Sequence, residues 1–159
     1  MTKAESATIR QATLSDVDIL VALTAEFYAE AGFTLSTADA TRAFTALLGS
    51  QQLGAVWLAE VEQRPVGHVV MTLAFSMEYG GLRGFIDDLY VNRLFRDRGI
   101  GAALLSEARD GALERGLRAL CVETGREDHP ARSLYARTGY VDSEHALLVQ
   151  PLQQPMHVA

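Results

Sequence analysis

The chain has 159 residues, of which 48% are hydrophobic, and a formal net charge of −6 from 20 acidic and 14 basic side chains. We expect one globular domain over 1–159, because this length and composition exclude disordered and fibrous proteins. The negative charge argues against nucleic acid as a partner and mildly favours cationic ligands. The sequence has no apolar run of the roughly 18 residues that a membrane span needs and no secretory signal. With Cys121 as its single cysteine, a cytoplasmic protein without an internal disulfide is expected.

Two helices are predicted in the first third of the chain. Ser15 and Asp18 resemble a capping box, and the apolar positions that follow at helical spacing predict a helix that ends at Gly32. A second start signal at Ser36 predicts a helix that closes at Gly49.

The middle of the chain changes to the pattern of strands. The break Gln63-Arg64-Pro65 predicts a hairpin turn, and Gly80-Gly81 marks a second turn. The strands predicted around these turns are 55–61, 66–76 and 84–91. The third strand contains Asp87 and Asp88, two acids that a buried strand does not normally carry. Both acids therefore require an explanation.

The last third alternates between helix and strand. A helix is predicted from Ile100 to about Arg115-Gly116. The remaining elements are a strand at 117–123, a short helix at 130–138 capped by Gly139, and one or two closing strands within 140–151. The whole order predicts one mixed α/β domain.

The segment Arg96-Asp-Arg-Gly-Ile-Gly101 lies at the start of the helix that follows the third strand. A helix start has backbone N–H groups without partners and a partial positive charge, and glycines let an anion approach them. The nearby positive charges are Arg93, Arg96 and Arg98. A pyrophosphate would fit this loop, although a tight turn with solvated arginines explains the same residues. The spacing matches neither a P-loop nor the dinucleotide fingerprint.

Three motifs in this order resemble the GNAT superfamily of acyl-CoA N-acyltransferases, and the resemblance spans nearly the whole chain. The motifs are Phe85-Ile-Asp-Asp-Leu-Tyr-Val91, Arg96-x-x-Gly99-x-Gly101, and Ala131-x-x-Leu134-Tyr135-x-x-x-Gly139-Tyr140. The resemblance implies a mixed, mostly antiparallel sheet flanked by helices, whose two parallel central strands diverge. It also implies acetyl transfer from acetyl-CoA to a primary amine, favouring a small cationic one, by direct attack in a ternary complex. Two alternatives are a non-catalytic acyl-CoA sensor and a protein or peptide N-acetyltransferase.

The resemblance also implies where acetyl-CoA binds. Its pantetheine arm would insert between the strand that ends at Val91 and the next strand, and an N–H of Leu89 or Tyr90 would stabilise the oxyanion. The implied binding residues are Leu89, Tyr90, Val91, Arg96, Asp97, Arg98, Gly99, Ile100, Gly101, Ala102, Asp128 and Tyr135. Asp128 stands where the family commonly has Asn, which puts that contact in doubt.

Proton transfer indicates which side chains must help. An amine of pKa ~10.4 costs about 4.6 kcal/mol to deprotonate at pH 7. Asp87 and Asp88 are the candidate bases, and strand alternation predicts that they point to opposite faces, so that only one reaches the amine. Alternatively, one of them caps a bulge and the other faces water. Tyr135 resembles the family's tyrosine that protonates the departing thiolate, or it simply packs on the sheet.

The acceptor site is the least determined part. By analogy with the family, the candidate acceptor-binding residues are Glu26, Tyr28, Glu78 and Asp87. No His, Cys and Asp cluster has metal-ligand spacing, so no metal is expected. The resemblance also makes a homodimer an expectation, through the closing strands.

Overall fold

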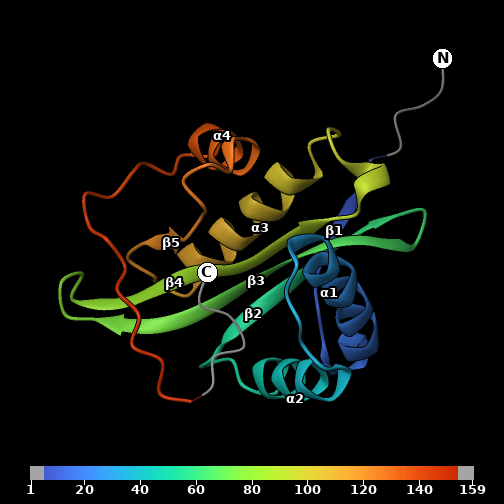
Figure 1. Ribbon diagram of the computed structural model, residues 1–159, viewed down its shortest axis with the longest axis horizontal. Coiled ribbons are helices and arrows are strands. Elements are labelled where there is room, and N and C mark those ends of the chain that lie inside the picture. Colours follow the sequence, from blue (N-terminus) through green and yellow to red (C-terminus); the bar gives the residue numbers. More distant parts are fainter. Residues whose placement is uncertain (1–5, 154–159) are drawn as a thin grey trace.

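The structure is a computed structural model that describes residues 6–153 (Figure 1). It contains the strands β1 (Thr8–Gln11), β2 (Gly54–Val61), β3 (Arg64–Ser76), β4 (Gly81–Val91) and β5 (Leu120–Val122). Its helices are α1 (Val17–Ala31), α2 (Thr37–Leu48), α3 (Ile100–Glu114) and α4 (His129–Arg137), with 3-10 turns η1 (Leu14–Asp16) and η2 (Arg93–Phe95).

One five-stranded sheet, in the order β1-β2-β3-β4-β5, forms the frame of the domain. Neighbouring strands are antiparallel except β4 and β5, which are parallel. The parallel pairing covers only three residue pairs, from Gly84 with Leu120 to Ile86 with Val122. Beyond Ile86 the two strands separate. The predicted sheet, mostly antiparallel with two diverging parallel strands, is confirmed.

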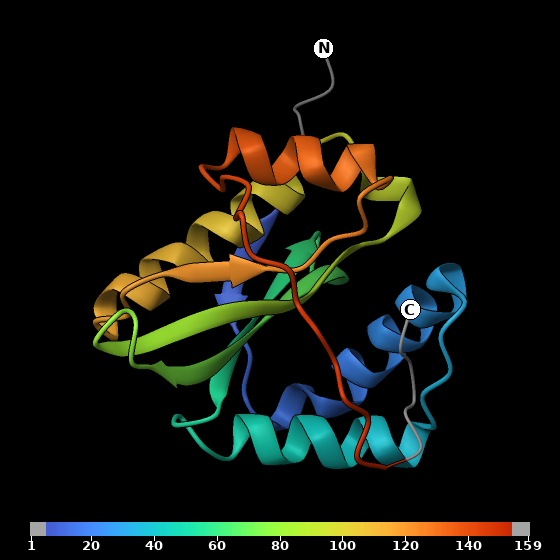
Figure 2. The ribbon, with the colours of Figure 1, turned by 60° about the vertical axis from the view of Figure 1, so that its left-hand side comes forward.

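Helices cover both faces of this sheet (Figures 1 and 2). Helices α1 and α2 bury Leu20 and Phe44 against Leu58 of β2 on one face, whereas α3 buries Leu104 against Met71 of β3 on the other. Burying each such side chain contributes about 1.5–3 kcal/mol. No helix among residues 6–153 is long and apolar enough to cross a membrane.

The helix boundaries agree with the sequence signals at three of four positions. Gly32 ends α1 in the left-handed conformation, with φ 74°, and Gly49 caps α2. The hydroxyl of Ser36 accepts the backbone N–H of Asp39 at 3.0 Å, as expected for an N-cap. The Ser15 capping box is wrong: α1 begins after Asp16, since the chain first makes the turn η1.

The structure corrects the predicted strands at both ends of the chain. The short edge strand β1 was not predicted, and the strand predicted at 117–123 is ordered only as Leu120–Val122. The closing strands predicted within 140–151 are wrong, because residues 138–153 form no strand and pair with no edge of the sheet. Strand propensity alone does not satisfy backbone N–H and C=O groups, which require a neighbouring strand.

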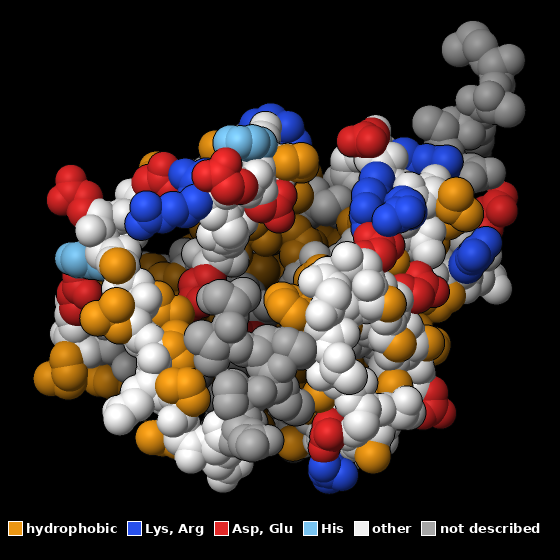
Figure 3. All heavy atoms as spheres, in the orientation of Figure 1, with side chains coloured by type: hydrophobic (Ala, Val, Ile, Leu, Met, Phe, Trp, Pro, Cys, Tyr) orange, Lys and Arg blue, Asp and Glu red, His pale blue; other side chains and the backbone are white. Residues whose placement is uncertain are grey.

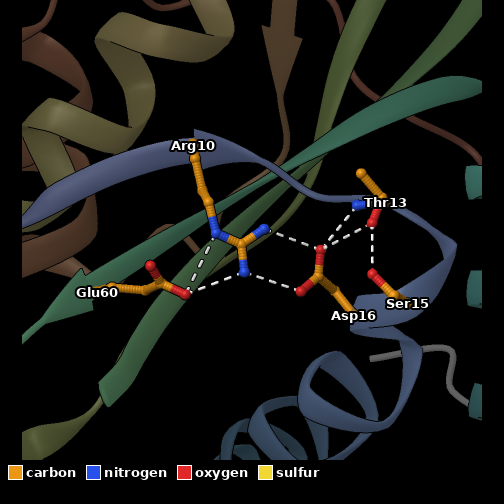
Figure 4. Close-up of polar contacts among 5 residues, drawn as sticks. All are labelled: Arg10, Thr13, Ser15, Asp16 and Glu60. Atoms are coloured by element: carbon orange, nitrogen blue, oxygen red, sulfur yellow. Dashed lines mark hydrogen bonds and ion pairs between the residues drawn. The ribbon is translucent and has the colours of Figure 1, made fainter. Parts of the chain in front are cut away.

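A network of charged groups joins β1 to the start of α1 (Figure 4). The guanidinium of Arg10 donates to both carboxylate oxygens of Asp16 at 2.8 and 2.9 Å, and to Glu60 of β2 at 3.0 Å. Asp16 is buried and also accepts the backbone N–H of Thr13 at 2.8 Å. The bonds from Arg10 lower the pKa of Asp16 to about 2.

We expect Asp16→Asn to lower the free energy of unfolding at pH 7 by about 2 kcal/mol, the value of this pKa shift. Because the folded-state pKa lies below the unfolded one, the contribution is present above about pH 4 and disappears as the pH falls toward 2. Urea unfolding of the wild type and of Asp16→Asn, at pH 7 and at pH 3, measures this contribution to the free energy of unfolding. Asp18→Asn, which changes an exposed residue of the same helix turn, should stay within about 0.5 kcal/mol. Equal losses at both pH values would contradict the ionic origin.

Candidate functional site

The loop between β4 and α3 ends in a helix start with free donors. Asp97 and Gly99 both adopt left-handed conformations, with φ 61° and 78°. No side chain caps α3, and within the described chain no acceptor is bonded to the backbone N–H groups of residues 100–102. The first amide to bond is that of Ala103, which donates to the carbonyl of Gly99 at 3.0 Å. These N–H groups and the helix dipole suit an anion.

Arg96 already has partners in this loop. Its guanidinium donates to Glu30 of α1 at 2.6 Å and to the backbone carbonyl of Val91 at 2.9 Å, and it lies 5.8 Å from the ring centroid of Tyr90. Arg98 is exposed and donates to the carbonyl of Leu94 at 3.1 Å. An anion bound at the loop can therefore contact the exposed Arg98. For Arg96 it has to compete with Glu30.

The start of α3 is also packed closely against α4. A Cβ atom at Gly101 would lie 3.2 Å from the side chain of Leu134, so glycine allows this approach. Leu89 and Val91 of β4 contribute side chains to the core beneath α3, together with Leu134. The segment of β4 that has left β5 therefore ends directly beside the free helix start.

A bulge in β4 determines where the two acids lie. Val70 of β3 pairs with Asp88 and Met71 pairs with Ile86, which leaves Asp87 as an extra residue. Ile86 packs in the core beneath α3, whereas Tyr90 packs beneath α1. Strict alternation therefore fails here, and the expectation of opposite faces is corrected.

The carboxylate of Asp88 accepts a hydrogen bond from a side chain of α1. The hydroxyl of Tyr28 donates to its carboxylate at 3.1 Å, and burial, followed by the charges of Asp88 and Asp87, raises the pKa of that phenol. Burial and then the charge of Asp87 raise the pKa of Asp88 to about 7, against the opposing effect of the Tyr28 bond. Asp87 is more exposed, and partial burial raises its pKa as well. Asp88 can thus gain or lose a proton near neutral pH.

Tyr135 of α4 lies close enough to Asp88 for that charge to act on its hydroxyl. Burial raises the pKa of Tyr135 to about 12, with smaller contributions from the charges of Asp128 and Asp88. Its ring packs edge-on against Tyr140 at 5.4 Å, and its hydroxyl has no hydrogen-bond partner among the described residues. Asp128 caps α4 by accepting the N–H of Ala131 at 3.1 Å. The carboxylate of Asp128 therefore already has a hydrogen-bond partner within α4.

The other predicted acceptor-binding residues do not gather at Asp88. Glu26 accepts the hydroxyl of Tyr90 at 3.0 Å and the amide of Asn92 at 2.9 Å, and Glu78 lies exposed in the turn after β3. Sequence reasoning missed the hydrogen bonds that Tyr90 and Arg96 donate to Glu30. The sequence did contain a signal for these contacts. Glu26 and Glu30 are four residues apart, which places both on one face of the predicted helix.

The face that carries α1 is hollowed between α1 and α4, and hydrophobic side chains lie at the bottom of the hollow (Figure 3). A separate cavity of about 150 Å³ lies between α1 and α2, lined in part by Thr24, Tyr28 and Phe33. Tyr28 therefore adjoins both this cavity and Asp88. No group of three or more metal-ligating acids, histidines or cysteines occurs within residues 6–153.

Comparison with known proteins gives the family. Residues 19–140 match the model of the Acetyltransferase (GNAT) family. The uncharacterized N-acetyltransferase YhfO of Bacillus subtilis is 30% identical over 135 residues, which cover 83% of this chain and 88% of that protein. An uncharacterized N-acetyltransferase of Archaeoglobus fulgidus is 34% identical over 132 residues, which cover 80% and 88%.

Solved structures have the same fold. The integron cassette protein HFX_CASS3, from the mobile metagenome of Cole Harbour Salt Marsh, is 47% identical with a TM-score of 0.86, covering 93% of this chain and 92% of that one. A predicted acetyltransferase of Clostridium acetobutylicum with acetyl-CoA is 20% identical, with a TM-score of 0.77 and coverage of 91% and 96%. Two further neighbours are a Brucella melitensis ribosomal-protein-alanine N-acetyltransferase (21% identical, TM-score 0.75, coverage 93% and 100%) and an aminoglycoside N-acetyltransferase in complex with CoA (14%, 0.83, 96% and 99%). The chain belongs to the Acetyltransferase (GNAT) family and is an N-acetyltransferase.

Proposed function

We propose that this protein transfers the acetyl group of acetyl-CoA to the primary amine of a small molecule, by direct attack while both substrates are bound. The observation that carries the proposal is the carboxylate pair Asp87 and Asp88 at the point where β4 leaves β5, with the Tyr135 phenol close by. A base and an acid thus lie near one opening in the sheet. We assign the reaction to the cytoplasm, since a highly charged thioester does not cross membranes unaided.

The donor end of the site is the loop after β4. The free N–H groups at the start of α3 fit a diphosphate, and the glycines allow its close approach. We assign this contact to residues 96–102, and the contact with the rest of the donor to 89–91. Acetyl-CoA supplies an acetyl thioester when bound. The predicted acetyltransferase of Clostridium acetobutylicum, which has the same fold, was solved with acetyl-CoA.

We assign the removal of the amine proton to Asp88. Its pKa of about 7 leaves roughly half of the molecules ionised at neutral pH, which suits a base at that pH. Tyr28 fixes the carboxylate by its hydrogen bond, and Asp87 adds a second negative charge nearby. Two adjacent carboxylates attract a protonated amine, which favours a cationic acceptor.

Tyr135 is the proposed acid. With a pKa of about 12 it keeps its proton throughout the neutral range, and its hydroxyl is not engaged by another described residue. It can therefore donate a hydrogen bond and then a proton to the sulfur as the carbon–sulfur bond breaks. Asp128, fixed as the cap of α4, stabilises the helix that carries Tyr135 rather than acting in the reaction.

We expect Asp88→Asn to lower kcat/KM by about 10²–10⁴. For an acceptor amine of pKa ~10 that binds protonated, the logarithm of kcat/KM of the wild type should rise with slope one below about pH 7 and level off above it, because only Asp88 must be ionised before it takes the amine proton. In Asp88→Asn it should keep rising with slope one toward the pKa of the amine, because the amine must then lose its proton to water. The measurement is a pH profile of CoA release from acetyl-CoA. Asp87→Asn is the matched control and should level off as the wild type does. The assignment fails if the two variants exchange these profiles.

We expect Tyr135→Phe to lower kcat by about 10², while calorimetry gives an acetyl-CoA affinity within about threefold of the wild type. Tyr140→Phe is the control, because its ring packs against Tyr135 and its buried hydroxyl also has no partner among the described residues. It should change kcat by less than about threefold. Full turnover by Tyr135→Phe across the pH range would remove the proposed acid.

We also propose that the protein forms a homodimer through the segment after α4. This segment runs from α4 toward α2 in front of β3 and β4 (Figure 2), and Val141, Leu148 and Leu152 are each about nine-tenths exposed. Burying these side chains against a second copy would be favourable. Sedimentation should give twice the mass of the chain, and Leu148→Lys should give the monomer. A wild-type monomer at high concentration would contradict the proposal.

A further inference from the structure

Arg83 of β4 lies on the same face of the sheet as Asp88. A Cβ atom at Gly84 would contact Met71 and Leu120, on the side of α3, so the neighbouring residues Arg83 and Phe85 face the other way. That other face is the one on which Asp88 meets α1. Arg83 therefore belongs to the acceptor side of the sheet, and nothing in the proposed mechanism uses it.

The guanidinium of Arg83 packs against aromatic rings and has no polar partner in the part of the chain that the structure describes. Its central carbon lies 4.8 Å from the ring centroid of Phe85 and 6.0 Å from that of Tyr79. The Nε atom is buried, and among residues 6–153 it has no acceptor and the side chain has no ion pair. A ligand does not reach the buried Nε, but the side chain as a whole is only partly buried, so its terminal nitrogens are able to bind an anion from outside the chain.

The pairing register gives the spacing between the two charges. Arg83 pairs with Ala74 and Asp88 pairs with Val70, four residues apart on β3, which corresponds to about 13 Å. The guanidinium, however, lies over the ring of Phe85, and Phe85 pairs with Thr72, only two residues from Val70. The guanidinium lies between these two register positions, so the register limits the separation of the two charges along the strand to about 7–13 Å. One small molecule can span this distance.

We infer that Arg83 binds a carboxylate of the acceptor, so that the acceptor is an aminocarboxylate: a free amino acid or short peptide whose reacting amine lies several bonds from its carboxylate. The inference rests on the proposed function, because Asp88 takes the amine. The amine nitrogen forms a bond to the acetyl carbon as the carbon–sulfur bond breaks. The bound ammonium gives one proton to Asp88 before the attack. The second N–H proton leaves as the amide forms and replaces the proton that Tyr135 gives to the sulfur, and the carboxylate of the acceptor is unchanged. A plain diamine would place a second positive charge next to Arg83.

The test compares three acceptors of equal chain length: 5-aminopentanoate, pentylamine and 1,5-diaminopentane. The wild type should prefer 5-aminopentanoate. Arg83→Gln should lower kcat/KM for 5-aminopentanoate by about tenfold to a hundredfold, the range for hydrogen bonds to a charged group. The same variant should change kcat/KM for pentylamine by less than about threefold. Arg83→Lys should restore part of the preference, and Arg83→Glu should reverse it toward the diamine.

The outcomes separate this inference from the proposed function. If all three amines are acetylated equally, or if Arg83→Gln lowers all three rates alike, the inference is overturned and the acetyltransferase assignment stands. If none is acetylated, binding of 5-aminopentanoate is measured by calorimetry in the wild type and in Arg83→Gln. Weaker binding by the variant then supports the carboxylate contact while the proposed reaction fails, and equal or absent binding overturns the contact too. Thermal unfolding of each variant checks that it is folded.

Discussion

Strand β4 pairs with a neighbouring strand on each side, but over very different lengths, and the rest of the site depends on this difference. It pairs with β3 along its whole length, but with β5 over only three residues. Beyond Ile86, β4 pairs with no strand on the β5 side within residues 6–153, although the carbonyl of Val91 at the end of the strand already accepts the guanidinium of Arg96. The bulge at Asp87 shifts the strand by one residue within the same stretch. Without it, alternation would return Tyr90 to the α3 side, away from Glu26 and Glu30.

The face beneath α1 combines buried polar groups with aromatic rings. Tyr90 is only 3% exposed, and its ring stacks on Phe27 at 5.5 Å while its hydroxyl reaches the glutamates of α1. His68 of β3 is fully buried beside Tyr90 and Phe44, and within the described chain neither ring nitrogen has a partner. Burial lowers the pKa of His68 to about 4, so this histidine stays neutral at physiological pH. Positive charge on this face therefore comes from arginines.

Local signals predicted local structure well. The hydroxyl of Ser36 and the left-handed glycine at 32 act within one turn of a helix, and the motifs around Gly99 and Tyr135 were sufficient to predict the family. The errors came from long-range pairing. Residues 140–151 have the composition of strands but pair with no strand among residues 6–153, and β1 is too short to stand out from its flanks. The bulge could not be predicted either, because it depends on the register between β3 and β4.

Helix α1 contacts both ends of the site. Tyr28 holds Asp88, and Glu30, about half a turn further along, holds Arg96. An anion that binds Arg96 competes with Glu30 for the same guanidinium, so breaking this ion pair lowers the net affinity for the anion. If that exchange shifted α1 and with it Tyr28, the effect would be reciprocal: each ligand would change the affinity for the other by the same factor.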